Sequence, residues 1–243
     1  SSKTATFMVL GSVCTRNCGF CDVTTGRPLP ADPEEPVQVA KAAAHLQLEH
    51  AVVTQVTRDD LEDGGAAHIA ETIRQLRSYV PEASVEVLVS DLTGATDAPD
   101  TVLEAGPDVF GHNIEMPKEL YSLARQQANY QRSLGVLRYA KENYPDVLTK
   151  TGFMVGMGET DDQIKSLLKD LAENKVDILT IGQYLQPSKD HVDLKEYISP
   201  DKFDEMKTWA EEAGIPYVVS SPFVRSSYKA ADAVQTLKKE HQS

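Results

Sequence analysis

No apolar run in the 243-residue sequence approaches the roughly 20 residues that a membrane-spanning helix needs. The first residues, SSKTATFMVLGSVC, contain a short apolar stretch typical of a strand and lack the layout of a signal peptide. Basic residues are also few, since 24 Lys and Arg stand against 37 Asp and Glu, a formal net charge of −13. A general nucleic-acid binder needs a basic face. We therefore expect a cytoplasmic protein with no membrane partner and no nucleic-acid partner.

Cysteine is scarce, and its three occurrences, Cys14, Cys18 and Cys21, all lie in the run CTRNCGFC. An odd number cannot pair completely, and no distant cysteine is present to form a disulfide across the fold. A structural zinc site needs a fourth ligand, and none of the six histidines falls near this loop. Three thiolates on a short loop instead suit an iron–sulfur cluster that keeps one iron free of protein ligands. Such an iron can bind a small substrate and pass it an electron.

Strand and helix patterns alternate along the whole chain. The expected strands cover residues 5–10, 51–56, 84–90, 108–115, 149–156, 177–185 and 217–221. The expected helices lie near residues 32–48, 66–80, 98–105, 130–142, 160–174 and 201–213. This alternation implies parallel strands joined by right-handed crossovers. The units are too few for a closed eight-fold barrel, so we predict one α/β domain over residues 1–243. Its expected architecture is an open, partial (βα)6 TIM-type barrel.

The unusual motifs of the sequence all follow expected strands directly. They are CTRNCGFC, RDDLEDGG, HNIE, GMGET, QYLQPS and SSPFVRSSY. In a parallel sheet the loops after the strands meet at one edge, where ligands and catalytic groups gather. The sequence therefore predicts an active site at the carboxyl edge of the sheet.

The cysteine spacing, with Phe20 just before the last cysteine, resembles the cluster motif of radical S-adenosylmethionine (SAM) enzymes. The resemblance implies an open (βα)6 barrel and a 4Fe–4S cluster on Cys14, Cys18 and Cys21. It also implies that the amine and carboxylate of SAM chelate the fourth iron. An electron from the cluster then releases a 5′-deoxyadenosyl radical that abstracts hydrogen from an unactivated carbon. Such C–H bonds carry no acidic proton, so general-base chemistry cannot start the reaction.

Paired glycines, Gly64 and Gly65, follow the second expected strand in RDDLEDGGA. Their backbone can approach a ligand closely, and the resemblance implies that they receive the methionine amine of SAM. The alternative is a tight strand-to-helix turn that uses glycine at positive φ. Residues of the run HNIE end the fourth expected strand, where alternation puts Asn113 and Glu115 on one face and His112 on the other. We predict that Asn113 and Glu115 contact the ribose or methionine part of SAM. The alternative is a satisfied buried polar pair, and His112 is interpreted as structural.

A second glycine motif, GMGET, contains Gly156 and Gly158 and opens an expected helix. It lacks the Lys-Ser/Thr of a P-loop, which disfavours binding of a nucleoside triphosphate. We predict instead that these glycines pack against the adenine of SAM.

Blocks over residues 5–230 resemble the lipoyl synthase family in order: ATFMVLGSVCTRNCGFC, RDDLEDGGAAH, LEAGPDVFGHNIE, YQRSLGVL, TKTGFMVGMGET, DILTIGQYLQPS and PFVRSSY. This resemblance implies sulfur insertion at C6 and C8 of an octanoyl chain on a lysine of a lipoyl-carrier domain. It also implies an electron donor such as flavodoxin or ferredoxin.

The same resemblance implies an auxiliary 4Fe–4S cluster that serves as the sulfur source. In the family, three cysteines of an N-terminal segment and one serine of RSSY hold it, and that serine matches Ser227. By chemistry alone, a serine pair at a strand–helix junction is more typical of an N-cap. The three cysteines of that segment have no counterpart in the 243 residues, and Lys229 replaces a frequent histidine. The second cluster therefore forms only if its missing ligands are supplied.

Several explanations of this difference remain open. The sequence can be truncated, it can belong to a paralogue whose partner supplies sulfur, or it can be a redesigned core. The alternative functions are a radical SAM enzyme acting on another carrier-bound acyl chain, and a non-catalytic iron–sulfur or SAM sensor. No catalytic side chain beyond the cofactor-binding groups is assigned from the sequence.

Overall fold

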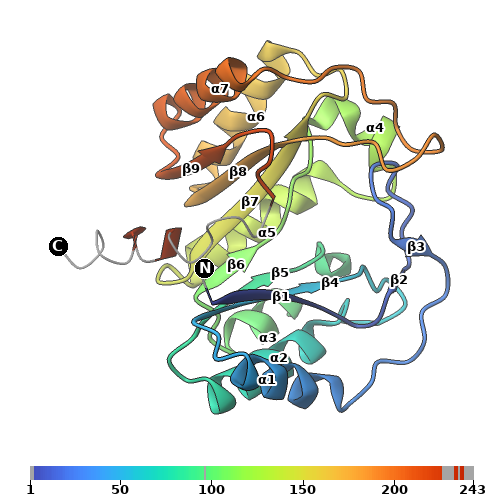
Figure 1. The fold of residues 1–243 in the computed structure, drawn as a ribbon, viewed down its shortest axis with the longest axis vertical. Coiled ribbons are helices and arrows are strands. Elements are labelled where there is room, and N and C mark those ends of the chain that lie inside the picture. The colour runs from blue at the N-terminus through green and yellow to red at the C-terminus, as the bar shows by residue number, and fades with distance from the viewer. Residues whose placement is uncertain (1–2, 96, 226–232, 235, 238–243) are drawn as a thin grey trace.

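Seven parallel strands form the main sheet of the computed structural model, which describes residues 3–95, 97–225, 233–234 and 236–237. Their order in the sheet follows the chain: β1 (Thr4–Val9), β4 (His50–Gln55), β5 (Ser84–Leu88), β6 (Val109–Gly111), β7 (Leu148–Val155), β8 (Ile178–Gln183) and β9 (Tyr217–Ser220). The sheet curves strongly, and β1 and β9 are its two edges (Figure 1). Within the described residues these edges do not pair, so the predicted open, partial barrel is confirmed.

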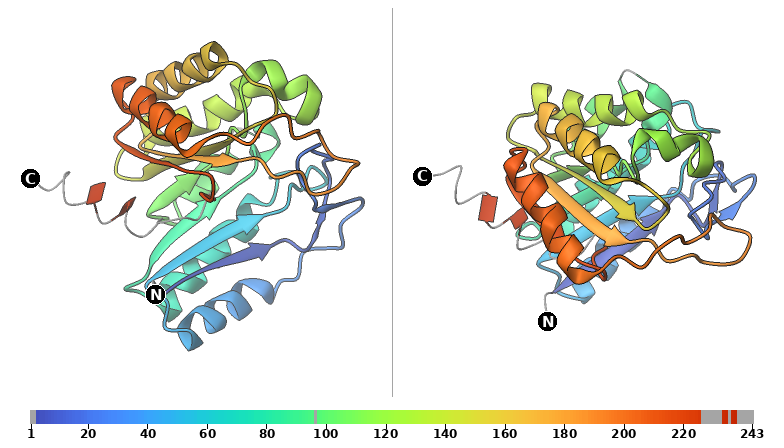
Figure 2. Two further views of the ribbon diagram at one scale, coloured as in Figure 1. Left: turned by 45° about the horizontal axis from the view of Figure 1, so that its top comes forward. Right: turned by 90° about the horizontal axis from the view of Figure 1, so that it is seen from above.

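Helices cover the outer face of this curved sheet (Figure 2). They are α1 (Glu35–His45), α2 (Ala66–Tyr79), α3 (Ala98–Leu103), α4 (Tyr121–Ala124), α5 (Tyr130–Asn143), α6 (Asp161–Glu173) and α7 (Pro200–Glu212), with short 3-10 turns η1 (Leu92–Gly94) and η2 (Lys118–Leu120). Local sequence explains the sharp starts. The Thr160 side chain accepts the N–H of Gln163 in a capping box that begins α6, and Ser199 caps α7 just before Pro200.

Two hydrophobic cores lie between the sheet and the helices. One joins α1, α2 and α3 to the outward side chains of β1, β4 and β5, as Val53, Ile73 and Val87 illustrate. The other joins α5, α6 and α7 to the strands that follow, for example through Leu168 and Phe203. Figure 1 shows these as a lower and an upper half of the molecule. The two halves meet at β6, in the middle of the sheet.

The expected strands and helices agree with the structure to within a few residues, apart from three features, the first of which is the unpredicted short helix α4. The short strands β2 (Val13–Cys14) and β3 (Thr24–Thr25) pair outside the main sheet and were not predicted. The fourth strand of the sheet, expected over 108–115, ends at Gly111. In the described part of the chain, no helix combines the length and apolar character needed to cross a membrane.

Candidate active site

The three cysteines lie in the segment that follows β1 at the carboxyl edge of the sheet, with Cys14 at the end of the short strand β2 and Cys18 and Cys21 in the loop between β2 and β3 (Figure 1). Backbone contacts fix the loop from both halves of the barrel. From one half, the N–H of Thr15 donates to the carbonyl of Thr57, which follows β4, at 3.0 Å. From the other, the N–H of Gly19 donates to the carbonyl of Ala124 at 2.8 Å, and the N–H of Val192 donates to the carbonyl of Gly19 at 2.8 Å. All three cysteines are free and half-buried. A loop held in this way presents its thiols in one place.

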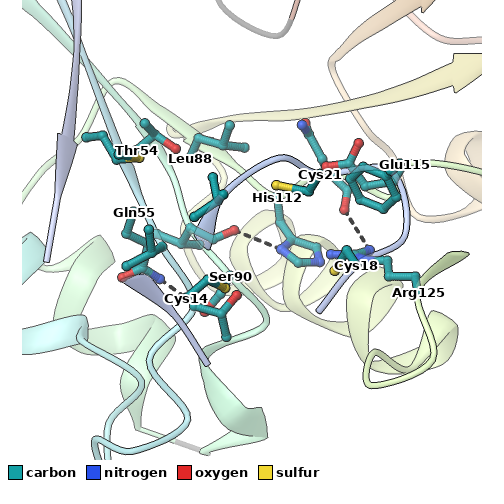
Figure 3. Close-up of a pocket in the computed structure, with 17 residues that line it drawn as sticks. Cys14, Cys18, Cys21, Thr54, Gln55, Leu88, Ser90, His112, Glu115 and Arg125 are labelled. Carbon is teal, nitrogen blue, oxygen red and sulfur yellow. Dashed lines mark hydrogen bonds between the residues drawn. The ribbon is translucent and has the colours of Figure 1, made fainter. Parts of the chain in front are cut away.

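The thiols of Cys14, Cys18 and Cys21 line a single cavity of about 270 Å³ in the barrel mouth. The ends of β4 and β5 form one wall, with Thr54 and Leu88, and the segment after β6 forms another (Figure 3). The sequence prediction that the cysteine loop and HNIE meet is therefore correct in space. A pocket of this kind, with apolar walls and a few converging polar groups, is the usual form of a ligand site.

Buried thiols without a compensating positive charge resist ionisation in this cavity. Burial raises the pKa of Cys18 to about 11, and the nearby Arg125 opposes the rise only in part. Burial likewise raises the pKa of Cys21, and the neighbouring Cys14 and Glu115 add to it. Binding of iron favours the thiolate form of these cysteines, because the metal supplies positive charge that Arg125 alone does not provide. The donor set is thus suited to a metal group.

The donor set also indicates what kind of metal group fits. Among the described residues, no three His, Cys, Asp or Glu side chains converge closely enough to hold a single metal ion. A cubane cluster separates its thiolate ligands more widely than a single ion does, and it needs only three when another ligand completes it. Three thiols around one cavity therefore fit a 4Fe–4S cluster better than a mononuclear site.

Arg16 anchors the cysteine loop to the segments after β4 and β5, and it was not among the residues predicted from the sequence. Its side chain is 6% exposed and binds Asp59 through two hydrogen bonds, of 2.8 and 2.7 Å. The same guanidinium donates to the fully buried Asp91 at 2.6 Å. Its backbone N–H points to the Sγ of Cys14, 3.4 Å away. The loop is thereby tied to the segments that follow β4 and β5.

Glu115 and Asn113 both line the cavity, as predicted, but not through strand alternation. After β6 ends, Glu115 takes a left-handed backbone conformation with φ 69°. Its N–H donates to the carbonyl of Gly152, and its carbonyl accepts the N–H of Met154. Burial raises the pKa of Glu115, while Arg125 and a hydrogen bond with Asn113 oppose the rise. The strained turn places the carboxylate at the cavity, near Cys18 and Cys21 (Figure 3).

Arg125 is a second residue that sequence reasoning missed. Its side chain is 9% exposed, lines the cavity, and lies beside Cys18 (Figure 3). One guanidinium nitrogen donates to the carbonyl of Asn113 at 3.0 Å and to the hydroxyl of Tyr121 at 3.0 Å. The N–H groups of the guanidinium outnumber these contacts. Arg125 therefore combines a structural clamp on the HNIE segment with a fixed positive charge at the cavity. No sequence signal marked Arg125, since it lies just after α4, a helix that was not predicted.

His112 also touches the cavity, and its contacts agree with the structural role expected for it. Its Nδ1 lies 2.9 Å from the carbonyl of Val89, and its Nε2 lies 2.9 Å from the hydroxyl of Ser133. Burial, with a further effect from Arg125, lowers the pKa of His112 to about 4. The ring is therefore neutral at physiological pH and bridges β5 to α5.

Gly64 and Gly65 lie outside the described cavity. Both have positive φ, and Gly65 precedes the first residue of α2. A Cβ on Gly64 would lie 2.9 Å from the backbone of Leu92, and one on Gly65 would collide with Leu10. Their backbone N–H groups bond within the turn, to Leu61 and Asp63. The packing therefore explains why glycine stands at both positions of this turn, and the contact with the methionine amine stays a prediction.

Gly156 and Gly158 also form a turn, and neither lines the cysteine cavity. The N–H of Gly156 donates to the carboxylate of Glu159, and the carbonyl of Gly156 accepts N–H groups of Lys195 and Glu196. A Cβ on Gly156 would collide with the side chain of Gln183. The contact with adenine predicted for these glycines stays a prediction. Ser227 lies outside the described residues, which extend to Arg225 in this segment.

Comparisons with known proteins agree with this site. The family model of the radical SAM superfamily matches residues 8–171. A lipoyl synthase of Rubrobacter xylanophilus is 53% identical over 235 residues, which is 97% of this chain and 73% of the relative. A lipoyl synthase of Shewanella oneidensis is 51% identical over 228 residues, which is 93% of this chain and 71% of the relative.

Solved structures show the same fold at much lower sequence identity. The structure of HydG, a maturase of the [FeFe]-hydrogenase, has a TM-score of 0.69 and 15% identity, covering 95% of this chain and 54% of its own. Methylornithine synthase (PylB) has a TM-score of 0.62 and 14% identity, covering 98% of this chain and 81% of its own. At such identities the likeness concerns the fold alone.

Proposed function

Because this chain belongs to the lipoyl synthase family of the radical SAM superfamily, we propose that it inserts sulfur at C6 and C8 of a protein-bound octanoyl chain. The observation that carries this proposal is the convergence of three free thiols on one half-buried cavity that also contains Glu115 and Arg125. The radical SAM family implies a 4Fe–4S cluster and SAM as cofactors. The acceptor is an octanoylated lipoyl-carrier domain, and a flavodoxin or ferredoxin supplies the electron.

Cys14, Cys18 and Cys21 would hold the cluster and leave one iron for SAM. The bound cluster supplies the electron that cleaves SAM to a 5′-deoxyadenosyl radical. Arg16 keeps the loop in place from below through its pairs with Asp59 and Asp91. The chain thereby fixes three ligand positions without using the metal to build the fold, because two hydrophobic cores already join the sheet to its helices.

The residues that would orient SAM are Asn113, Glu115 and Arg125, which line the same cavity. Asn113 and Glu115 offer an amide and a carboxylate to the ribose hydroxyls or the methionine amine, and their mutual hydrogen bond sets their orientation. Arg125 offers a fixed guanidinium to a carboxylate, and its clamp on the Asn113 carbonyl holds that charge still. Leu88, Met8 and the Val56 and Val89 side chains form the apolar part of the cavity wall. Such a wall limits water, which would otherwise intercept a radical.

A second cluster of the family type would take Ser227 as one ligand. All three cysteines of residues 1–243 serve the first site. A single alkoxide cannot anchor a cubane, so the other ligands of the second cluster must be supplied in addition. We therefore propose that residues 1–243 alone cleave SAM and abstract hydrogen, and that sulfur delivery requires the added ligands.

The test uses protein of residues 1–243, reconstituted with iron and sulfide and reduced with dithionite. Mass spectrometry then follows 5′-deoxyadenosine and an octanoyl-lysyl peptide. We expect 5′-deoxyadenosine whose yield rises with the octanoyl peptide, and a sulfur-containing peptide only when a peptide or partner with the three missing cysteines is added. No response to any octanoyl substrate would contradict the assigned substrate, and no 5′-deoxyadenosine at all would contradict the enzyme.

A further inference from the structure

The connection from β8 to α7 lies against the segment that carries the cysteines (Figures 1 and 2). It covers residues 184–199 and contains no helix or strand, and we call it the strap. Internal hydrogen bonds fix its shape. The Tyr184 hydroxyl donates to the carbonyl of Val192 at 2.7 Å. The Gln186 side chain donates to the carbonyl of His191 and accepts the N–H of Leu194, each at 3.2 Å. A segment that holds its own conformation in this way can position another segment.

The strap contacts the cysteine loop through backbone and side chains. The N–H of Val192 donates to the carbonyl of Gly19 at 2.8 Å. A Cβ on Gly19 would lie 2.9 Å from the Val192 side chain, so glycine at this position permits the close approach. Phe20 of the loop and Val192 and Leu194 of the strap pack against the same hydrophobic core. The strap therefore holds the part of the loop between Cys18 and Cys21.

His191 makes the polar contact of the strap with a cysteine. Its Nε2 lies 3.1 Å from the carbonyl of Cys21, and a carbonyl can only accept, so Nε2 carries the hydrogen. Its Nδ1 lies 2.8 Å from the Ser188 hydroxyl, which also accepts the N–H of Asp190 at 3.2 Å. The Asp22 carboxylate is 3.9 Å from Nε2, beyond hydrogen-bond distance. Ser188 thus orients the ring, and the ring donates to the carbonyl of Cys21.

The backbone carbonyls of all three cysteines accept a hydrogen bond, but the donors differ in origin. The carbonyl of Cys14 accepts the N–H of Gly26, and the carbonyl of Cys18 accepts the N–H of Cys21, each at 3.0 Å. These two bonds lie within residues 14–26. The donor to Cys21, His191, is 170 positions further along the chain. Cys21 is therefore the cysteine whose backbone depends on the strap.

We propose that His191 is a positioning residue for Cys21, an inference that rests on the cluster of the proposed function. The hydrogen bond restricts rotation of the peptide that follows Cys21, and with it the direction in which Sγ enters the cavity. Loss of a partner that orients a metal ligand reduces metal affinity by about 10–100-fold, and a partner of the ligand's backbone has a smaller effect. The strap follows β8 and the cysteine segment follows β1, so the third ligand position depends on both halves of the barrel.

The experiment measures how firmly the protein of residues 1–243 holds its iron. The protein is reconstituted with iron and sulfide and mixed with an excess of a coloured iron chelator without oxygen. His191→Leu removes the donor and should release iron at least about threefold faster. His191→Gln keeps an N–H donor at the same distance along the side chain and should stay within about twofold of the unmodified rate. His45→Leu is the matched control, because it makes the same change at an exposed histidine of α1.

A spectroscopic measurement separates positioning of Cys21 from a general loss of stability. The electron paramagnetic resonance signal of the reduced cluster should broaden in His191→Leu, because Cys21 then adopts several positions, and should remain narrow in His191→Gln. If His191→Leu does not fold without iron, as judged by thermal unfolding, Ser188→Ala replaces it, since it frees the ring and should speed iron release by about twofold.

Unchanged iron release and an unchanged signal in the folded His191→Leu or Ser188→Ala protein would overturn the role of His191. Release from His191→Gln as fast as from His191→Leu would also overturn it, because the donor would then make no difference. Failure of the unmodified protein to bind iron would instead count against the proposed function.

Discussion

The two halves of the barrel solve different problems with different residues. In the half that contains β1, β4 and β5, charged side chains hold the cysteine loop, through Arg16 with Asp59 and Asp91. In the half that contains β7, β8 and β9, glycines allow close packing on the inner face, because a Cβ on Gly152 would collide with the Thr180 hydroxyl and one on Gly182 with the Val224 carbonyl. The difference teaches that one half fixes its loop with charged pairs, while the other brings neighbouring strands and side chains into close contact by omitting side chains.

A buried ion pair joins the two halves beneath the site. Lys150 on β7 donates to Glu86 on β5 at 2.7 Å, across the intervening β6. Both side chains are nearly inaccessible, and His50 lies 3.5 Å from the other oxygen of Glu86.

Lys150→Met should have the largest effect on stability. It leaves Glu86 buried beside only His50, and removing one partner of a buried pair costs about 3–5 kcal/mol. The double variant Lys150→Met with Glu86→Gln should recover much of this loss, because no buried charge remains unpaired. Urea unfolding of both proteins measures the effect. A loss below about 1 kcal/mol in the single variant would show that the halves do not depend on this pair.

Arg16→Gln should destabilise the cysteine half by about 2 kcal/mol, because Asp91 keeps only Arg132 at 3.4 Å. The loop should also hold less iron after reconstitution, although all three thiols remain. Arg132→Gln is the matched control, since its partner is the same Asp91 but its side chain is 43% exposed. Equal iron content in the two variants would contradict the anchoring role of Arg16.

Lowering the pH should reduce the free energy of unfolding through His112, whose pKa of about 4 in the folded protein lies below its ordinary value of 6.5. The unfolded chain then binds a proton that the folded chain does not, so stability falls as the pH drops from about 6.5 toward 4. At pH 5.5 the loss amounts to about 1.4 kcal/mol relative to pH 8. Urea unfolding at both pH values, compared with His112→Gln, isolates this contribution. An identical pH dependence in the variant would exclude His112 as its source.

Gly135→Ala should give the smallest effect and sharpen the contrast with Gly152. Gly135 lies inside α5 with open space around its missing Cβ. Alanine there should raise the free energy of unfolding by about 0.5–1 kcal/mol, because it restricts the unfolded chain and favours helix. Thermal unfolding measures the gain. A lower free energy of unfolding in Gly135→Ala would show that this glycine is needed for packing.

The fold was predictable because strand and helix periods in this chain agree with their burial. Residues 51–56 and 149–156, for example, were expected as strands and form β4 and β7 within one residue. The cysteine loop was predictable from spacing alone. The predicted positions of Asn113 and Glu115 at the cavity were correct, although the reason was wrong, because β6 ends at Gly111 and a left-handed turn places Glu115.

Other parts of the site depend on tertiary contacts that no local pattern encodes. Arg16 bonds to Asp59 and Asp91 only because the segments after β1, β4 and β5 lie together in the fold. Arg125 reaches the cavity from the position just after α4. The roles of Gly64 and Gly156 depend on which side chains, Leu92 and Gln183, fold against them. In the sequence, a glycine of a tight turn looks the same as one in a ligand-binding loop or one that allows close packing. Only packing separates these uses.

The iron and sulfide content of reconstituted residues 1–243, measured beside Cys18→Ala, tests the central claim most directly. The unmodified protein should bind about four irons per chain and produce 5′-deoxyadenosine, because its three thiols hold one cluster. Cys18→Ala should bind almost no iron and cleave no SAM, while its circular dichroism matches the unmodified protein without iron. About eight irons in the unmodified protein, or SAM cleavage by Cys18→Ala at the unmodified rate, would contradict the assignment of these thiols.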